Sequence, residues 1–194
     1  MANRLHVRLF PLALAFTLSA SWAATARAQG FISPLIGFNF GGDAACPNVT
    51  GCTDKRLNYG VSLGKMGSVF GFEEEFAYAK DFFGTAPTMS SSVLTVMSNL
   101  MLVPRIGPVR PYGVVGFGLI KTHVELTPAS VLTTDNNNFG WNIGGGLLVL
   151  AGHVGVRGDV RYFHSFQNLA IPGFALNNSK LDYGRASAAL VLAF

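Results

Sequence analysis

From about residue 36 to the C-terminus, large apolar side chains recur at every second position of short segments. In the clearest segment, Phe70, Phe72, Phe76 and Tyr78 alternate with glycine, glutamate and alanine. Successive side chains of a strand point to opposite faces, so a period of two predicts β-strands. Eight such segments lie at Ile36–Phe40, Asn58–Gly64, Phe70–Ala79, Val93–Val103, Arg110–Leu119, Gly140–Val149, Val154–Tyr162 and Arg185–Phe194.

The connections between these segments alternate between long and short. The long ones are 41–56, 81–92, 121–138 and 165–180, and the short ones are 65–68, 104–109 and 151–152. Short turns at one end and longer loops at the other are typical of outer-membrane barrels, in which the turns are periplasmic. We therefore predict an all-β fold, an eight-stranded antiparallel up-and-down transmembrane β-barrel with both termini on the periplasmic side.

The composition supports a membrane protein that crosses with strands. Hydrophobic residues make up 49% of the chain and charged residues only 12%, against about 25% charged in a usual soluble domain. After the N-terminal leader, no segment has the 18 or so consecutive apolar residues of a spanning helix. A closed barrel satisfies its own backbone groups and is the other way to span a bilayer. An exported, soluble β-protein is the alternative.

The two faces of the predicted strands differ in kind. We expect the large apolar positions to face lipid and the opposite positions, with Gly, Asn, Ser, Glu and Arg, to face the lumen. A lipocalin-like soluble barrel would reverse this, but glycines recur on the polar face, where a narrow lumen needs small residues. The fourth segment blurs the pattern, because Met97 and Met101 stand among its polar positions.

The N-terminus has the order of a secretory signal peptide. Arg4 and Arg8 precede an apolar run, and the run leads to an A-x-A pattern that ends at Ala28. We expect residues 1–28 to be removed and residues 29–194 to form the barrel. The leader holds Arg4, Arg8 and Arg27 and no acid, so its removal lowers the net charge from +4 to +1. This loss removes the main support for nucleic-acid binding, which needs a clustered basic patch.

Cys46 and Cys52 lie close together in a segment rich in Gly, Asp, Asn and Thr. In an exported protein this arrangement predicts a loop closed by a local disulfide. A metal pair is the alternative, but no histidine or further cysteine lies nearby. We expect neither a metal nor a cofactor.

The last segment, YGRASAALVLAF, ends in an aromatic residue preceded by alternating apolar residues. Together with GFEEEFAYAKDFFG, VRPYGVVGFGL and VGVRGDVRYF, it resembles the small outer-membrane β-barrel family, the OmpA-like and OmpX-like porin superfamily. The resemblance covers nearly all of the chain after the leader. It implies a location in the outer membrane and a C-terminal signal, including Leu190, Leu192 and Phe194, that is read by the barrel assembly machinery. It says little about function, which must be argued from sites.

Charged residues form the most specific polar feature of the lumen face. The members are Glu73, Glu75, Arg157, Asp159, Arg161 and Arg185. An eight-stranded barrel is only wide enough for side chains to fill it, so these charges must pair with one another. We interpret them as a structural plug, and the alternative is a narrow proton or ion path. Glu74 departs from the pattern because alternation places it on the lipid face, which implies a local bulge, a protonated carboxyl or a protein contact.

Signs of catalysis are weak. His164-Ser165 resembles the Ser/His/Glu group of outer-membrane lipid A deacylases, but that family spaces the two residues two apart on one face. Here they are adjacent and point to opposite sides, and no acid is evidently positioned to orient His164. We expect His123 in a loop and His153 in a turn, and we expect no enzymatic activity.

The function best supported by the sequence is a structural or surface-interaction role through the extracellular loops, with an unidentified extracellular partner. Outer-membrane lipid or lipopolysaccharide and the assembly machinery are the other expected partners. The alternative is a narrow channel or a transporter of small hydrophobic molecules, similar to OmpW-like barrels. A lipid A-modifying enzyme is a third, weaker hypothesis.

Overall fold

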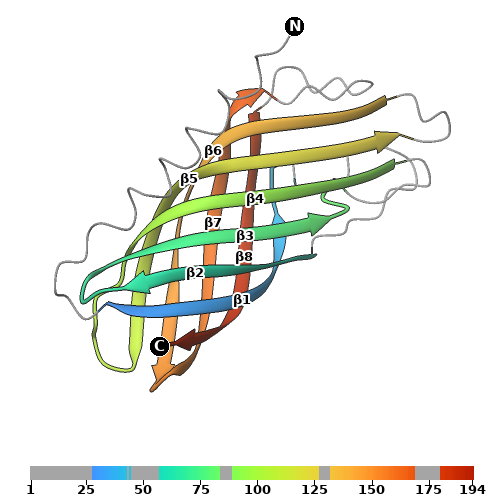
Figure 1. Ribbon diagram of the computed structural model, residues 1–194. Coiled ribbons are helices and arrows are strands. Elements are labelled where there is room, and N and C mark those ends of the chain that lie inside the picture. The colour runs from blue at the N-terminus through green and yellow to red at the C-terminus, as the bar shows by residue number, and fades with distance from the viewer. Residues whose placement is uncertain (1–27, 43, 45–56, 84–88, 127–131, 169–179) are drawn as a thin grey trace, which may run out of the picture.

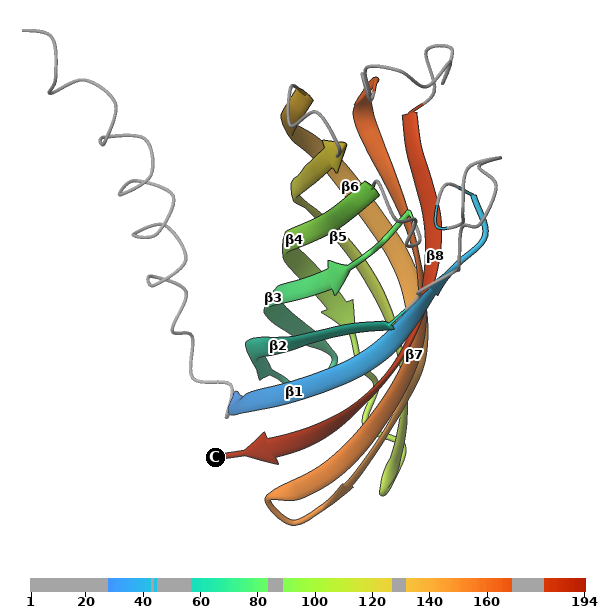
Figure 2. The same cartoon turned by 90° about the vertical axis from the view of Figure 1, so that its right-hand side faces the viewer.

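The eight strands form one closed barrel in which every strand is antiparallel to its neighbours along the chain (Figures 1 and 2). The computed structural model describes residues 28–42, 44, 57–83, 89–126, 132–168 and 180–194. The strands are β1 (Gln29–Phe40), β2 (Leu57–Met66), β3 (Phe70–Lys80), β4 (Met89–Leu102), β5 (Val109–Leu126), β6 (Leu132–Ala151), β7 (Val154–Asn168) and β8 (Lys180–Ala193). The predicted fold class and strand number are confirmed.

The first and last strands close the barrel. β1 pairs with β8 from Phe31 opposite Ala193 to Phe40 opposite Gly184. Beyond this ladder, the backbones of Gly30 and Phe194 exchange two hydrogen bonds of 2.9 Å. Both ends of the strand array therefore lie at the same end of the barrel, which we call the terminal end. The opposite end, where β1 leads to β2 and β7 to β8, is called the loop end.

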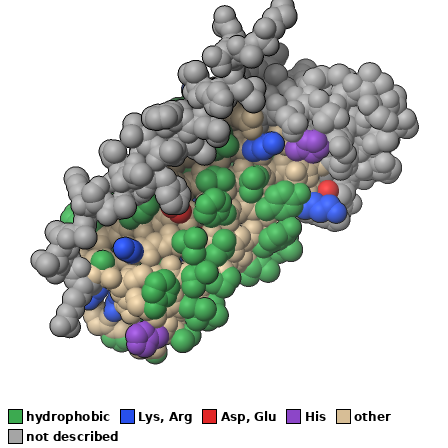
Figure 3. Space-filling model, viewed as in Figure 1, with side chains coloured by type: hydrophobic (Ala, Val, Ile, Leu, Met, Phe, Trp, Pro, Cys, Tyr) green, Lys and Arg blue, Asp and Glu red, His purple; other side chains and the backbone are tan. Residues whose placement is uncertain are grey.

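Large apolar side chains cover the outside of the barrel. Ile36, Phe117 and Leu147 are each more than half exposed, whereas their neighbours along the strand point inward. Figure 3 shows a broad hydrophobic band on one face, with Lys, Arg and His side chains towards its two ends. This is the distribution expected where the middle of a barrel meets hydrocarbon and its ends meet water.

Among the described residues, no helix is long and apolar enough to cross a membrane.

The hairpin of β5 and β6 is longer than the sequence predicted. The two strands stay paired from Val109 opposite Val149 to Leu126 opposite Leu132, so most of the predicted loop 121–138 is strand. His123, which we expected in a loop, lies in β5 opposite Ser92 of β4. The prediction failed because the apolar positions change face near the end of the predicted strand. Leu119 lies in the outward phase, but Ile120 and Thr122 are fully buried in the lumen, and Lys121 is exposed on the outside.

Several other boundaries also differ from the prediction. β1 begins at Gln29, β4 at Met89 and β8 at Lys180, and β7 continues to Asn168, so each begins earlier or ends later than its alternating segment. The turn between β6 and β7 consists of Gly152 and His153 instead of the predicted 151–152. Gly152 has a φ of 65°, which suits the first central position of a tight hairpin turn.

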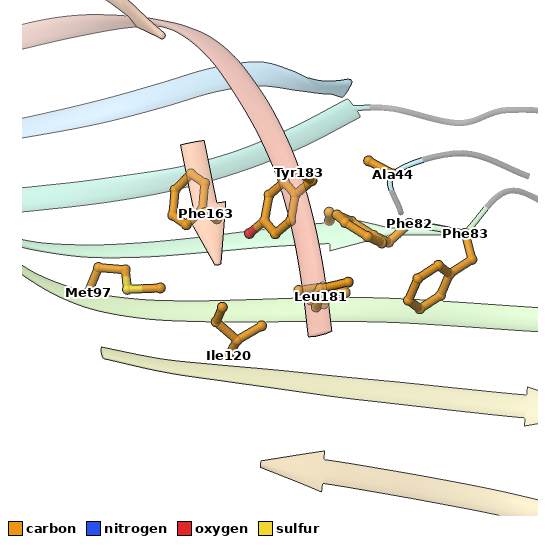
Figure 4. Close-up of a cluster of buried hydrophobic side chains, with 10 residues drawn as sticks. Ala44, Phe82, Phe83, Met97, Ile120, Phe163, Leu181 and Tyr183 are labelled. Atoms are coloured by element: carbon orange, nitrogen blue, oxygen red, sulfur yellow. The ribbon is translucent and has the colours of Figure 1, made fainter. Parts of the chain in front are cut away.

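The lumen contains more apolar side chains than the sequence predicted. One buried cluster lies at the loop end: Ala44, Ala79, Phe82, Phe83, Val93, Met97, Ile120, Phe163, Leu181 and Tyr183 (Figure 4). A second lies at the terminal end: Phe31, Met66, Met101, Val103, Tyr112, Val114, Leu148, Leu150, Val191 and Ala193. Met97 and Met101 therefore keep the register of β4 and belong to the lumen. Buried polar residues such as Thr122 and Asn138 also lie towards the loop end, so apolar and polar side chains share that part of the lumen.

Candidate functional site in the barrel lumen

The structure brings all six predicted lumen charges together between the two apolar clusters. Glu73 and Glu75 come from β3, Arg157, Asp159 and Arg161 from β7, and Arg185 from β8. Each is 5% exposed or less. Residues two apart on a strand share a face, so the spacing within β3 and β7 aims these side chains inward. We call these six residues the charge layer.

Arg161 is the centre of the charge layer. Its Nη2 lies 2.9 Å from Glu73 Oε1 and 3.0 Å from Asp159 Oδ2, and its Nη1 lies 3.1 Å from Glu75 Oε2. The planar guanidinium presents its donors as a fixed fork, which suits contact with several carboxylates at once. One fully buried cation thus joins all three acids.

The other two arginines hold the edges of the charge layer. Arg157 Nη1 lies 2.5 Å from Glu73 Oε2, and Arg185 forms an ion pair with Glu75. The guanidinium of Arg185 also lies 4.5 Å from the ring centre of Phe163, which belongs to the loop-end cluster. A cation over an aromatic face is electrostatically favourable, so this contact joins the charge layer to the cluster above it.

Neutral polar residues that were not predicted as site residues add hydrogen bonds to the charge layer. Tyr112 on β5 donates its hydroxyl to Asp159 Oδ2 at 2.5 Å, and Ser187 on β8 donates to Asp159 Oδ1 at 2.7 Å. Ser62 accepts a hydrogen bond of 2.8 Å from Arg157. All three share the inward phase of their strands, which was a readable signal. Ser187 stands directly opposite Asp159 in the β7–β8 ladder, whereas Tyr112 and Ser62 contact residues of a strand that is not their neighbour, and no sequence spacing identifies these contacts.

Glycines make room for the charged side chains. A Cβ added to Gly144 on β6 would lie 2.8 Å from Cγ of Arg161, and one added to Gly146 would lie 2.7 Å from Cβ of Asp159. A cavity of only about 10 Å³ remains beside Arg185, Asn39 and Asn58. That space is about one water molecule in size. These clearances show that the charge layer is densely packed. Because it has three acids and three arginines, it carries no net formal charge.

Outside the barrel, Glu74 lies on the lipid face without a bulge. The ladders of β3 with β2 and β4 run continuously through Glu74, opposite Leu63 and Ser98. Ser98 Oγ lies 2.8 Å from Glu74 Oε1 and 2.9 Å from Oε2. Of the three explanations that the sequence left open, the register excludes the bulge, and the geometry shows a contact with a hydroxyl of the next strand.

A second outward polar group corrects the expectation for His164. Asp182 on β8 stands directly opposite His164 and forms an ion-pair contact with its Nδ1, and Tyr162 donates a 2.8 Å hydrogen bond to the same carboxylate. An acid does orient His164, and the sequence missed it because the two residues meet only through strand pairing. Ser165 is fully buried in the lumen, so it points away from this pair, as adjacency on a strand requires.

The predicted assembly signal lies on the outer surface of the barrel. Leu190, Leu192 and Phe194 all point outward at the terminal end, and Phe194 is 77% exposed.

Cys46 and Cys52 lie outside the described residues, so their disulfide stays a prediction, as does removal of residues 1–28. Within the described part of the chain, no group of three or more His, Cys, Asp or Glu residues could hold a metal ion.

The closed barrel and its outward apolar surface define a small membrane-spanning β-barrel. The sequence matches the family of the outer membrane protein beta-barrel domain over residues 10–194, and the chain belongs to this family. Membership implies the bacterial outer membrane as its location.

Solved structures with the same fold share little sequence with this chain. Neisserial surface protein A is 13% identical, with a TM-score of 0.61, over 86% of this chain and 97% of that protein. Outer membrane protein H of P. aeruginosa is 15% identical, with a TM-score of 0.57, over 86% and 100%. Outer membrane protein W of E. coli is 14% identical, with a TM-score of 0.50, over 88% and 100%. These similarities establish the fold alone. No curated protein matches the sequence significantly.

Proposed function

We propose that this protein is a closed, non-conducting barrel with a structural or surface-interaction role at the loop end. The observation that carries the proposal is the layered lumen. A neutral charge layer lies between two buried apolar clusters. Ions crossing such a lumen would have to displace both clusters and break several buried ion pairs.

The loop end is the side on which we place the interaction surface. The three longest connections, 41–56, 81–88 and 169–179, lie there, and the β5–β6 hairpin extends the barrel wall in the same direction. Long loops are extracellular in outer-membrane barrels, which supports an outward orientation for this end. Loops on a rigid scaffold commonly carry recognition residues.

Outer-leaflet lipid is the first partner that we propose. Lys80 on β3, Lys121 on β5 and Lys180 on β8 are exposed near the loop ends of their strands. Cations at that level suit the phosphate groups of lipopolysaccharide. The assembly machinery is the second proposed partner, through the exposed C-terminal Phe194.

We also propose that the protein is not an enzyme. His164 and Asp182 resemble part of a catalytic group, but Ser165 lies on the other side of the wall. The outward neighbours of His164 are Tyr162, Trp141 and Phe166, which offer no aliphatic hydroxyl or thiol nucleophile. Lipid A from cells with and without the protein should have the same mass spectrum, and an altered acyl pattern would contradict this proposal.

Planar-bilayer recording tests the closed lumen. The purified wild-type barrel should show no steady conductance. Steady, ion-selective openings whose size changes in Arg157→Ala or Glu73→Gln would contradict the proposal and support the channel alternative.

Transport of a small hydrophobic molecule is the second candidate function. The apolar loop-end cluster, with Phe82, Phe83 and Phe163, is the feature that favours it (Figure 4). Uptake of a fluorescent hydrophobic solute into barrel-containing vesicles, compared with empty vesicles, distinguishes this candidate from a closed barrel.

A further inference from the structure

Glu74 is an ionisable residue in the middle of the lipid-facing wall. It lies four residues from Phe70, near the terminal end of β3, and four from Tyr78, near the loop end. A strand of about 9–11 residues spans the membrane, so Glu74 lies far from both interfaces. Acids at this depth are unfavourable on a lipid face, and ionisable groups inside a membrane commonly mark a functional site.

Ser98 satisfies only part of the hydrogen-bonding capacity of Glu74. Its hydroxyl oxygen is 2.8 and 2.9 Å from the two carboxyl oxygens, and its single proton can be donated to only one of them at a time. A carboxylate offers about four acceptor sites. Among the described residues, no Lys, Arg or His forms an ion pair with Glu74. The pair therefore lacks a cation.

Apolar and aromatic side chains are the nearest neighbours of Glu74 on the outer face, and the exposed Lys65 lies two residues beyond Leu63 on β2, opposite Phe72 and without an ion pair to Glu74. Phe72 and Phe76 flank it on β3 and are 42% and 41% exposed, and Phe117 stands next to Ser98 on β5 and is 63% exposed. Leu63 on β2 closes the remaining side. Aromatic rings attract ammonium groups through their negative faces, and more strongly where water is excluded. An acid framed by exposed rings is thus suited to an ammonium group with an apolar chain.

We propose that Glu74 and Ser98 form a binding site, open to the bilayer, for a lipophilic amine. The amine enters uncharged, and the carboxyl proton of Glu74 moves to the amine nitrogen. The O–H bond breaks, an N–H bond forms, and the resulting ammonium stays hydrogen-bonded to the carboxylate. Phe72, Phe76 and Phe117 contact the substituents of the nitrogen, and the alkyl chain lies along the apolar wall.

Other occupants fit the site less well. An anionic group would be repelled by the acid. A calcium ion takes six to eight oxygen ligands, whereas this surface provides the oxygens of one carboxyl and one hydroxyl. A second copy of the chain that used the same patch would bring a second acid to the same place.

The test measures binding of radiolabelled dodecyldimethylamine to the barrel in phospholipid nanodiscs, with empty nanodiscs as the baseline. Wild-type protein should bind about one equivalent above the baseline. Glu74→Gln keeps the size of the side chain but cannot give up a proton in this way, and it should weaken binding at least about tenfold, as expected for loss of a charge-assisted hydrogen bond. Heat-modifiable gel mobility verifies that the variant is folded.

Three further variants and a control ligand distinguish binding by the Glu74 carboxyl group from general adsorption to the apolar wall. Ser98→Ala removes the hydroxyl that contacts Glu74 but leaves the acid in place, so it should weaken binding less than Glu74→Gln does. Phe72→Leu should weaken binding several-fold, whereas Phe139→Leu, at an exposed ring on β6, should not. Dodecanol, which has the same chain but accepts no full charge, should show no dependence on Glu74.

The proposal is overturned if wild-type and Glu74→Gln proteins bind the amine equally, or if dodecanol binds as tightly as the amine. A Glu74→Cys variant that forms an interchain disulfide, together with no amine binding by the wild-type protein, would instead assign this surface to a second copy of the chain.

Discussion

At the scale of single residues, the lumen is held by mutual dependence of its charges. A single residue, Arg161, contacts all three acids, Glu73, Glu75 and Asp159. Burying an ion pair is not strongly stabilising by itself, because both groups lose their water. Removing one partner is costly, however, because the other charge stays buried. Each member of the charge layer is therefore held in place by the others.

This dependence predicts a large effect of Arg161→Ala. Three carboxylates would lose their shared cation in a fully buried position, and the free energy of unfolding should fall by about 3–5 kcal/mol. Urea unfolding of the refolded barrel measures the change. Arg105→Ala, at an exposed arginine in the β4–β5 turn, is the matched control and should change it by less than about 0.5 kcal/mol. Equal effects of the two variants would contradict the proposed role of the charge layer.

At the scale of the strands, one irregularity stands out in an otherwise regular ladder. Between β7 and β8 the pairing passes from His164 opposite Asp182 to Asn168 opposite Lys180, so residues 165–167 stand opposite Leu181 alone. Ser165 replaces the missing ladder bonds. Its hydroxyl accepts a 2.8 Å hydrogen bond from the Leu181 N–H and donates to the Gln167 carbonyl at 2.9 Å.

Ser165→Ala should therefore destabilise the loop end of the β7–β8 pair. It leaves the buried N–H of Leu181 without its acceptor, which costs about 1–3 kcal/mol. Hydrogen exchange should show faster exchange at Leu181, while the terminal ends of β7 and β8 stay protected. Ser68→Ala, at an exposed turn serine, is the control. Unchanged exchange at Leu181 would mean that water satisfies this group equally well.

The end of β8 leads to a prediction about assembly. Phe194→Ala retains the two backbone hydrogen bonds to Gly30 and removes only the exposed ring. If the ring is recognised by the assembly machinery, the variant should assemble poorly in cells and refold normally in detergent. Ile106→Ala removes another exposed apolar side chain at the terminal end and should assemble normally. Equal losses of assembly in cells and refolding in detergent would indicate that Phe194 acts only through packing.

At the scale of the whole molecule, the lumen is closed in three layers. The charge layer meets the terminal-end cluster where Tyr112 donates to Asp159, and it meets the loop-end cluster where Arg185 lies over Phe163. The apolar clusters need no charges to exclude water. The seal should thus survive a local change in the charge layer.

We accordingly predict that Arg157→Ala, although less stable, shows no steady conductance. The substitution enlarges the space beside Glu73 but leaves both apolar clusters intact. Single-channel recording of the variant beside the wild-type protein provides the measurement. A variant that conducts while the wild-type protein does not would show that the charge layer alone forms the seal.

The sequence by itself determined the number of strands, their order and the face on which each residue lies. A period of two in side-chain character is a local property, because pleating fixes the direction of each side chain from its neighbours. For the same reason the sequence placed Glu73, Arg161 and Arg185 in the lumen and Glu74 on the lipid face. Between Leu119 and Ile120 the apolar positions of β5 change from the outward to the inward face, and the strand ends of the β5–β6 hairpin were predicted wrongly.

Only the tertiary structure decided which inward residues meet. Alternation along each strand shows that Arg161, Glu75 and Tyr112 point inward. Their contacts depend on strand register and on the closure of the sheet, which brings side chains of β3 and β5 within reach of β7. The same holds outside the barrel, where pairing of β7 with β8 sets Asp182 beside His164, and pairing of β3 with β4 sets Ser98 beside Glu74. Local alternation fixes direction along one strand, whereas contact across a barrel is a property of all eight strands together.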